Sequence, residues 1–294
     1  MATAAEWLEG ARPRTLPTGI SPVLAGSSIA WWYSGADPVV AALCLVIALG
    51  LVIGVNFAND YSDGVRGADE DRVGPQRLVG SGAAEPARVR TAAFACFAVS
   101  ALAGLVAVLL TGHWWLLAVG VICVLAAWFY TGGRHPYGYL GLGEIFVFVF
   151  FGLVAVGGTV YLQLGRVPAA GWVSAIGIGL LACGVLVTNN LRDIVGDTAS
   201  GKRTLETRLG DRATRWLYVG LVVLSALCVV VVAALTTWWV LLGLAGFVLL
   251  VPACRALLAG ATGMDLVATL RATGQGELLC AVGLLVGVGI GRPW

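Results

Sequence analysis

Two short stretches of this 294-residue chain gather carboxylate and amide side chains within an otherwise apolar sequence. The first contains Asn56, Asn59, Asp60 and Asp63, at intervals of one to three residues. Residues three or four apart share one face of a helix, so these side chains are expected to point to one spot at the end of a helix. An ionised carboxylate is costly at membrane depth, which favours a functional interpretation of this face.

The second stretch contains Asn189, Asn190, Asp193 and Asp197, which we expect on one helical face in the same way. Hard oxygen ligands without histidine or cysteine are typical of Mg²⁺, which commonly completes its coordination with waters and the oxygens of a substrate phosphate or diphosphate. The sequence therefore predicts a Mg²⁺ site that both stretches share. Its predicted metal ligands, which are also predicted catalytic residues, are Asp60, Asp63, Asp193 and Asp197.

Basic residues follow both acidic stretches and match phosphate oxygens as forked or point-charge donors. They are Arg66, Arg72, Arg77, Lys202, Arg203 and Arg208. Lys202 and Arg203 are favoured for a diphosphate because they follow Asp197 in a turn that contains glycine, and Lys202 is also predicted to be catalytic. For Arg72 and Arg208, an equal alternative is that they only set membrane orientation.

The composition places the chain among integral membrane proteins: 59% of its residues are hydrophobic, 12% are charged, and the mean hydropathy is +0.90. A span needs about 20 apolar residues, and the backbone must satisfy its hydrogen bonds within each helix. We predict one all-α domain over residues 1–294, with cytoplasmic cap loops at about 59–90, 132–140, 191–213 and 259–276. Nine spans are expected: Leu16–Trp32, Pro38–Ala58, Thr91–Leu110, Trp114–Thr131, Gly141–Leu162, Trp172–Asn190, Thr214–Leu235, Trp238–Leu258 and Glu277–Gly291.

The distribution of basic residues predicts the orientation of these spans. With nine spans, 16 of the 18 lysines and arginines fall on one side, and only Arg166 and Arg292 fall on the other. The basic side is expected in the cytoplasm, which gives a cytoplasmic N-terminus, an outside C-terminus and an active site that faces the cytoplasm. The lipid bilayer is the expected surrounding, and no nucleic-acid partner is expected. Small residues four apart, such as Gly283 and Gly287, predict close helix packing.

Several motifs together resemble a known family. NDYSDGVRGAD and NNLRDIVGDTASGKRTL are similar to the two aspartate-rich motifs of the UbiA superfamily of intramembrane prenyltransferases. RPRTLPTGISPVLAG, DRVGPQRLVGSG and YTGGRHPYGYLGLGEIFVFVFFG resemble more closely its 1,4-dihydroxy-2-naphthoate polyprenyltransferase branch, and the resemblance spans most of the chain. Gly67 stands where many members have a third aspartate, and Asp69 follows two residues later, so the role of Asp69 stays open.

The resemblance implies nine helices around a central cavity in a bacterial cytoplasmic membrane. It implies the transfer of a polyprenyl group from polyprenyl diphosphate to 1,4-dihydroxy-2-naphthoate, with loss of diphosphate and CO₂, in menaquinone biosynthesis. Mg²⁺ on the four aspartates would neutralise the leaving diphosphate, helped by Lys202, Arg203 and Arg66, while Arg134 would hold the naphthoate carboxylate. The loop from Tyr130 to Glu144 is the expected lid or acceptor-binding wall. The expected substrate-binding residues are Asn56, Asn59, Arg66, Arg77, Tyr130, Arg134, Asn190 and Arg203.

Three alternatives remain at this point. A UbiA-type enzyme with a different aromatic acceptor has the same motifs. A CDP-alcohol phosphotransferase begins its motif as Asp60-x-x-Asp63-Gly64 does, but has Ala-Arg where this chain has Gly67 and Ala68. A cation-coupled transporter is disfavoured because the acidic residues gather at one side of the membrane, whereas transporters bind their ions near the midplane.

Overall fold

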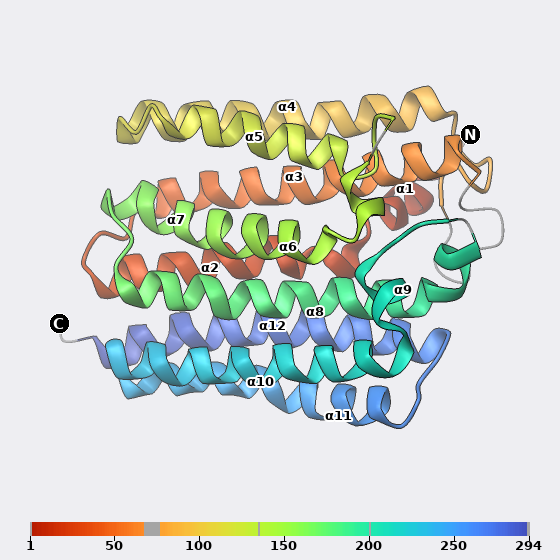
Figure 1. The fold of residues 1–294 in the computed structure, drawn as a ribbon. Helices are drawn as coiled ribbons and strands as arrows, with labels where there is room; N and C mark the ends of the chain where they lie inside the picture. Colours follow the sequence, from red (N-terminus) through yellow and green to blue (C-terminus); the bar gives the residue numbers. More distant parts are fainter. Residues whose placement is uncertain (1, 68–76, 135, 200, 293–294) are drawn as a thin grey trace.

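The computed structural model describes residues 2–67, 77–134, 136–199 and 201–292. Over these residues the regular structure is helical, as predicted, and the long helices lie side by side in a bundle (Figure 1). Three short segments, η1, η2 and η4, are 3-10 helices, and η3 is a π-helix. In chain order the helices are α1 (Ala4–Gly10), η1 (Pro13–Thr15), α2 (Pro17–Trp32), α3 (Pro38–Val65), α4 (Pro86–Thr111), α5 (Leu116–Phe129), η2 (Tyr137–Leu140), α6 (Gly143–Val147), η3 (Phe148–Val154), α7 (Ala155–Leu164), α8 (Ala169–Ala199), α9 (Leu205–Leu209), α10 (Asp211–Leu235), η4 (Trp238–Gly246), α11 (Phe247–Leu258) and α12 (Met264–Gly291).

Seven segments of the described chain are long and apolar enough to cross a membrane. The two other predicted spans correspond to α2, which has 16 residues, and α5, which has 14. Helices of this length extend about 21 to 24 Å, which is less than the ~30 Å hydrocarbon core of a bilayer. The protein is a multi-pass membrane protein, and the seven candidates are Pro38–Val65, Pro86–Thr111, Gly143–Leu164, Ala169–Ala199, Asp211–Leu235, Trp238–Leu258 and Met264–Gly291.

Local sequence signals set several helix boundaries. Asp37 caps α3, because its Oδ1 accepts hydrogen bonds from the backbone N–H groups of Val39 (2.8 Å) and Val40 (3.1 Å). Proline stands at the first position of α3 and of α4, where no N–H group is needed. Gly112, with φ of 75°, ends α4 in the left-handed conformation that glycine adopts readily.

Two acidic stretches that we expected partly in loops are helical. α3 continues to Val65 and α8 continues to Ala199, so both helices extend into the predicted cap loops 59–90 and 191–213. Each stretch prolongs the helical spacing of the preceding span, and many of its polar side chains are buried or face a cavity rather than lipid. The predicted loop 132–140 includes the short helix η2.

The prediction for the end of the chain is wrong. α12 begins at Met264 and has 28 residues, whereas we expected a loop at 259–276 and a short last span. Polar side chains in the first half of α12 gave the appearance of a loop, but Thr269, Thr273 and Glu277 are buried between helices. The two threonine hydroxyls donate to carbonyls one turn earlier, which satisfies them within the helix.

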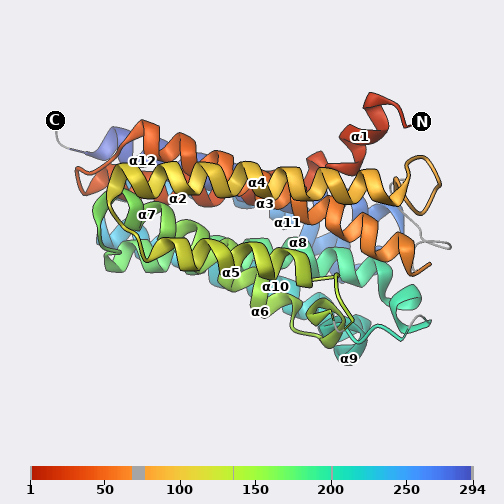
Figure 2. The same cartoon turned by 90° about the horizontal axis from the view of Figure 1, so that it is seen from above.

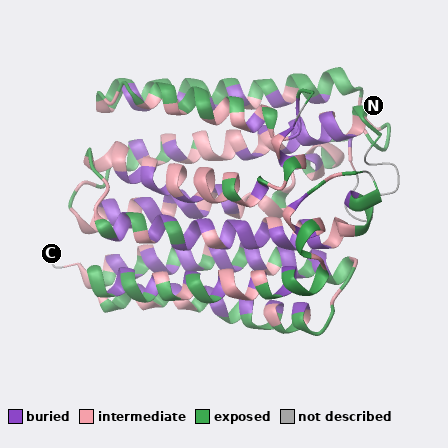
Figure 3. Cartoon of the chain, viewed as in Figure 1, coloured by how far each residue is buried: buried purple, intermediate pink, exposed green. Residues whose placement is uncertain are grey.

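Close helix packing holds the C-terminal half together. A Cβ added at Gly287 would lie 2.3 Å from the carbonyl oxygen of Trp239, and one at Gly283 would lie 2.5 Å from that of Leu242. The backbones of α12 and η4 therefore touch, as the glycine spacing predicted. Buried residues concentrate on α8 and α12, whereas α4 and α5 are largely exposed, as expected of helices that face lipid (Figure 3).

The polar ends of the two long acidic helices meet at one end of the bundle. The C-terminal ends of α3 and α8 lie at the end that also carries α1, η2 and α9 (Figures 1 and 2). α12 ends at the opposite end, so the described chain begins and finishes on opposite ends of the bundle.

Candidate active site

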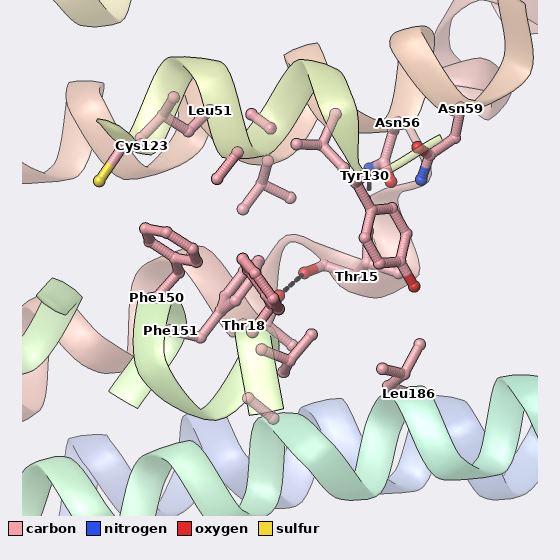
Figure 4. A pocket seen from close by; sticks show the side chains of 18 of the residues that line it. Thr15, Thr18, Leu51, Asn56, Asn59, Cys123, Tyr130, Phe150, Phe151 and Leu186 are labelled. Atoms are coloured by element: carbon pink, nitrogen blue, oxygen red, sulfur yellow. Dashed lines mark hydrogen bonds between the residues drawn. The ribbon is translucent and has the colours of Figure 1, made fainter. Parts of the chain in front are cut away.

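A cavity of about 1380 Å³ runs between α3, α5, η3, α7 and α8. It exceeds the range of about 300–1,000 Å³ that is usual for sites of small ligands. Figure 4 shows Asn56, Asn59 and Tyr130 at one end of it, with Phe150 and Phe151 further along. Apolar side chains dominate the remainder. The charged side chains of its lining are Glu9, Arg12, Arg14, Asp60, Asp63, Arg77, Arg192, Asp193, Asp197 and Lys202.

The phenylalanines reach the cavity from the π-helical segment η3. Phe150 and Phe151 are adjacent in sequence, and both rings lie at the cavity (Figure 4). π-Helical turns are frequent at functional sites because they alter the direction of side chains locally. Gly152 permits this segment to lie against α8, since a Cβ there would be 2.8 Å from the Cα of Gly179.

The two asparagines of α3 connect the polar end of the cavity to neighbouring segments. Asn56 Nδ2 donates to the carbonyl oxygen of Ala11 (2.9 Å) and to Thr15 Oγ1 (3.0 Å), which joins α3 to the N-terminal segment. Asn59 Oδ1 accepts from the hydroxyl of Thr131 at 2.7 Å, just beyond α5. Both side chains are buried and line the cavity, so they also hold its wall together.

The two aspartates of α3 have different surroundings. Asp60 is 1% exposed, and its two oxygens accept from the backbone N–H groups of Leu78 (2.8 Å) and Val79 (3.0 Å). Asp63 Oδ1 accepts from the phenol of Tyr139 at 2.7 Å. Asp60 therefore anchors the turn that precedes α4, whereas Asp63 connects the end of α3 to η2.

The two aspartates of α8 lie next to cations of the same chain. Arg192 binds both oxygens of Asp193, at 2.7 and 2.8 Å, and its Nη2 also donates to Asn189 Oδ1 at 2.9 Å. Lys202 Nζ lies 3.5 Å from Asp197 Oδ1. These cations reduce the repulsion between the carboxylates that line the cavity.

Tyr139 joins the two acidic helices. Its ring lies under Lys202 Nζ, 4.9 Å from the ring centroid, and under the Arg66 guanidinium at 5.6 Å. Burial, and next the carboxylate of Asp63, raise the pKa of the Tyr139 phenol above its usual range, so it stays protonated and donates to Asp63. Arg66 also donates to the carbonyl oxygens of Thr131 and Gly133, which holds the segment after α5.

Most of the site residues predicted from sequence line one cavity. All four aspartates do so, and so do Asn56, Asn59, Arg77, Tyr130, Asn190 and Lys202. Arg66, Arg134 and Arg203 do not line it. Arg134 is exposed, so its predicted role at a substrate carboxylate requires its side chain to turn inward. Asp69 and Arg72 lie outside the described residues.

Sequence reasoning missed three arginines of the cavity lining. Arg12 and Arg14 approach from the N-terminal segment, and Arg192 stands between Asn189 and Asp193. Their positions gave a usable signal, because Arg192 lies within the second acidic stretch and the other two stand in the RPRT sequence before the first span.

The donor set suits Mg²⁺ when phosphate oxygens complete the coordination. Among the described residues, no three or more His, Cys, Asp and Glu side chains form a ready-made metal cluster. Mg²⁺ does not need one, since it is usually bound by one or two carboxylates, waters and substrate phosphates. Here the carboxylates come in two pairs, on α3 and α8, with the cations Arg77, Arg192 and Lys202 beside them.

Known proteins resemble this chain over most of its length. A model of the UbiA prenyltransferase family matches residues 19–274. A relative from Mycobacterium tuberculosis, described as 1,4-dihydroxy-2-naphthoate octaprenyltransferase, is 50% identical over 292 residues, which is 99% of each chain. The Escherichia coli protein of the same description is 41% identical over 228 residues, 76% of this chain and 74% of that one.

Solved structures share the fold. A UbiA homolog from Aeropyrum pernix has a TM-score of 0.68 at 15% identity, covering 93% of this chain and 97% of that one. A UbiA homolog from Archaeoglobus fulgidus, bound to GPP and Mg²⁺, has a TM-score of 0.65 at 11% identity, covering 96% and 99%. Since the family model spans most of the sequence and near relatives cover it almost completely, this chain belongs to the UbiA prenyltransferase family.

Proposed function

We propose that this enzyme transfers a polyprenyl group from polyprenyl diphosphate to 1,4-dihydroxy-2-naphthoate, with release of diphosphate and CO₂, and so forms demethylmenaquinone. The observation that carries the proposal is the polarity of the cavity, which has paired aspartates and cations at one end and a long apolar remainder. A polyprenyl diphosphate is divided in the same way, into a charged diphosphate end and a long apolar isoprenoid tail. The identity of 50% to a naphthoate octaprenyltransferase supports the choice of acceptor.

In this proposal the residues at the polar end bind and stabilise the leaving group. Lys202, Arg77 and Arg192 donate to the diphosphate oxygens, on which charge develops as the allylic carbon–oxygen bond breaks. Mg²⁺ held by Asp63, Asp193 and the other aspartates would add the largest positive charge. The apolar wall keeps water away from the allylic cation, so the electron-rich aromatic ring is the nucleophile that reaches it.

The test is an assay of the purified protein for diphosphate release. Release is expected only when a polyprenyl diphosphate and 1,4-dihydroxy-2-naphthoate are both present, with CO₂ in equal amount. Release with another aromatic acceptor and not with the naphthoate would favour a different enzyme of the same family. Use of a CDP-alcohol, or cation transport without any turnover, would contradict the proposal altogether.

The proposed metal leads to a prediction about chelators. Activity should require Mg²⁺ or Mn²⁺ and disappear in excess EDTA, and Zn²⁺ should not restore it, because the lining offers hard oxygen ligands. An unreactive diphosphate analogue should tighten metal binding, since two ligands of one site affect each other reciprocally. Metal titration by calorimetry with and without the analogue measures this. Full turnover in EDTA would remove the metal from the mechanism.

We also propose one domain with nine spans, including α2 and α5, whose polar end faces the cytoplasm of a bacterial cell. The 16 basic residues on that side support this orientation. A reporter inserted after Gly82 and another after Gly201 should both be cytoplasmic, and a C-terminal tag should be outside. A cytoplasmic C-terminal tag would show that the number of spans is even.

A further inference from the structure

A close pair of carboxyl groups, one buried and one half-buried, lies behind the polar end of the cavity, and the proposed transfer reaction does not use it. Glu206, in the first turn of α9, has no exposed surface, and Glu144, at the start of α6, lies within hydrogen-bonding reach of it. Asn190 Nδ2 connects the two, at 3.0 Å from Glu206 Oε2 and 3.3 Å from Glu144 Oε1.

The pair has the geometry of two carboxyl groups that share one proton. Two carboxylates this close repel each other, and burial removes Glu206 from water, so the pair does not carry two negative charges. Neither glutamate has an ion pair in the described part of the chain, and Glu206 Oε1 has no hydrogen-bond partner there. Burial first, and then Glu144, raise the pKa of Glu206 to about 8. A proton between the two carboxyl groups satisfies the otherwise unpartnered oxygen.

Few other titratable groups face this pair. Tyr130, beyond the end of α5, and Cys183 on α8 are titratable neighbours of the pair, and Cys183 Sγ donates to the backbone carbonyl of Glu144. The buried Glu277 of α12 lies near Cys183 as well.

At the start of α10, Arg215 is bound to Asp211 and to the carbonyl oxygens of Leu257, near the end of α11, and of Ala261, just after it. Arg208, on the same short helix as Glu206, donates to the carbonyl oxygen of Leu140. Neither arginine therefore forms an ion pair with the two glutamates.

The pair determines which atom Asn190 presents to the cavity. Both hydrogens of its amide point to carboxyl oxygens, so Oδ1 faces away from the pair. Oδ1 accepts no hydrogen bond from the described residues, and Asn190 lines the cavity. Leu186, one turn earlier on α8, points into the cavity opposite Tyr130 (Figure 4). Asn190 lies four residues after Leu186, on the same face of α8. Its Oδ1 is therefore a hydrogen-bond acceptor one helical turn from the point where Leu186 lines the cavity.

We propose that the Glu144–Glu206 pair, with one shared proton, fixes the amide of Asn190 so that its Oδ1 accepts a hydrogen bond from a ring hydroxyl of the aromatic acceptor. The inference rests on the proposed function. Glu144 and Glu206 are positioning residues, and Asn190 touches the substrate. A hydroxyl that donates to Oδ1 has more electron density on its oxygen, which makes the ring a better nucleophile, and an acceptor without that hydroxyl leaves a buried oxygen unsatisfied.

The first test compares Glu206→Ala with Glu206→Gln in steady-state kinetics. The alanine variant frees the Asn190 amide to rotate, so KM for the naphthoate should rise about 10-fold or more while KM for the prenyl diphosphate changes little. The glutamine variant imitates the protonated acid, because its carbonyl oxygen accepts from Asn190 and its amide donates to Glu144. It should therefore recover most of that loss. Glu85→Ala, an exposed position, is the matched control.

The second test is the pH dependence of KM for the naphthoate and of KM for the prenyl diphosphate. Glu206 holds the shared proton below its pKa of about 8 and loses it above. The second negative charge then repels the carboxylate of the naphthoate, so KM for the naphthoate should rise between pH 7 and pH 9 in the native protein. It should stay level in Glu206→Gln, which has no proton to lose there.

Binding of an unreactive prenyl diphosphate analogue, measured by calorimetry, shows whether each variant is folded. If Glu206→Ala does not fold, Asn190→Leu takes its place, because it removes Oδ1 and should raise KM for the naphthoate by a similar factor. Equal increases in both KM values, or a glutamine variant as impaired as the alanine variant, would overturn the inference. A native protein that does not use the naphthoate at all would instead contradict the proposed function.

Discussion

Replacement of Asp63 by asparagine should lower turnover by about 100-fold or more while the protein stays folded. The asparagine oxygen can still accept the hydrogen bond from Tyr139, so the contact between α3 and η2 is kept. What is lost is the negative charge that the proposed metal and diphosphate site needs. Turnover at saturating concentrations of both substrates measures the effect, and thermal unfolding in detergent measures the stability.

Two variants provide the comparison for this prediction. Asp265→Asn removes an exposed carboxylate at the start of α12, away from the cavity lining, and should leave turnover near the native value. Asp60→Asn should lower both turnover and stability, because one of the two backbone N–H groups at Leu78 and Val79 loses its acceptor. Near-native turnover in Asp63→Asn would argue against a shared site for the aspartates.

Replacement of Gly287 by alanine should destabilise the bundle by about 1–3 kcal/mol. The added methyl group would lie 2.3 Å from the carbonyl oxygen of Trp239 and 2.6 Å from its carbonyl carbon. A side chain could relieve this overlap by adopting another rotamer, but the backbone of η4 cannot. α12 and η4 must therefore move apart. The measurement is the midpoint of thermal unfolding in detergent.

Gly220→Ala is the matched control, because a Cβ at this position of α10 meets nothing within 4 Å. Its helix should be unchanged or slightly more stable, since alanine favours helix by about 1 kcal/mol relative to glycine. If both variants lowered the midpoint equally, the effect would come from glycine flexibility in general and not from the contact with η4.

Much of the fold could be predicted because lipid leaves the backbone few choices. Long apolar runs must be helices, and the spacing of the aspartates correctly placed the two acidic stretches on helices that line one cavity. The start of α12 was missed because hydropathy measures contact with lipid, whereas Thr273 and Glu277 are buried against other helices.

Pairing between side chains was the part of the site that spacing did not reveal. Asn190 was expected on the same face as Asp193, yet its amide points to Glu144 and Glu206, which lie 46 and 16 residues away in sequence. The ion pair between Arg192 and Asp193 could not be predicted either, because no sequence pattern indicates that an arginine will bind the aspartate next to it. Such contacts depend on how the helices and the loops between them come together in space.

The partners that the chain gives to its own acidic residues have a consequence for how the protein is made. Asp60 is held by backbone amides and Asp63 by Tyr139, while the two acidic residues of α8 lie beside Arg192 and Lys202. A newly inserted chain can therefore complete its bundle in a membrane that contains no substrate. Any cation that enters must compete with the arginine and the lysine, so we expect the protein without substrate to bind Mg²⁺ weakly, and the proposed ion to bind together with the diphosphate.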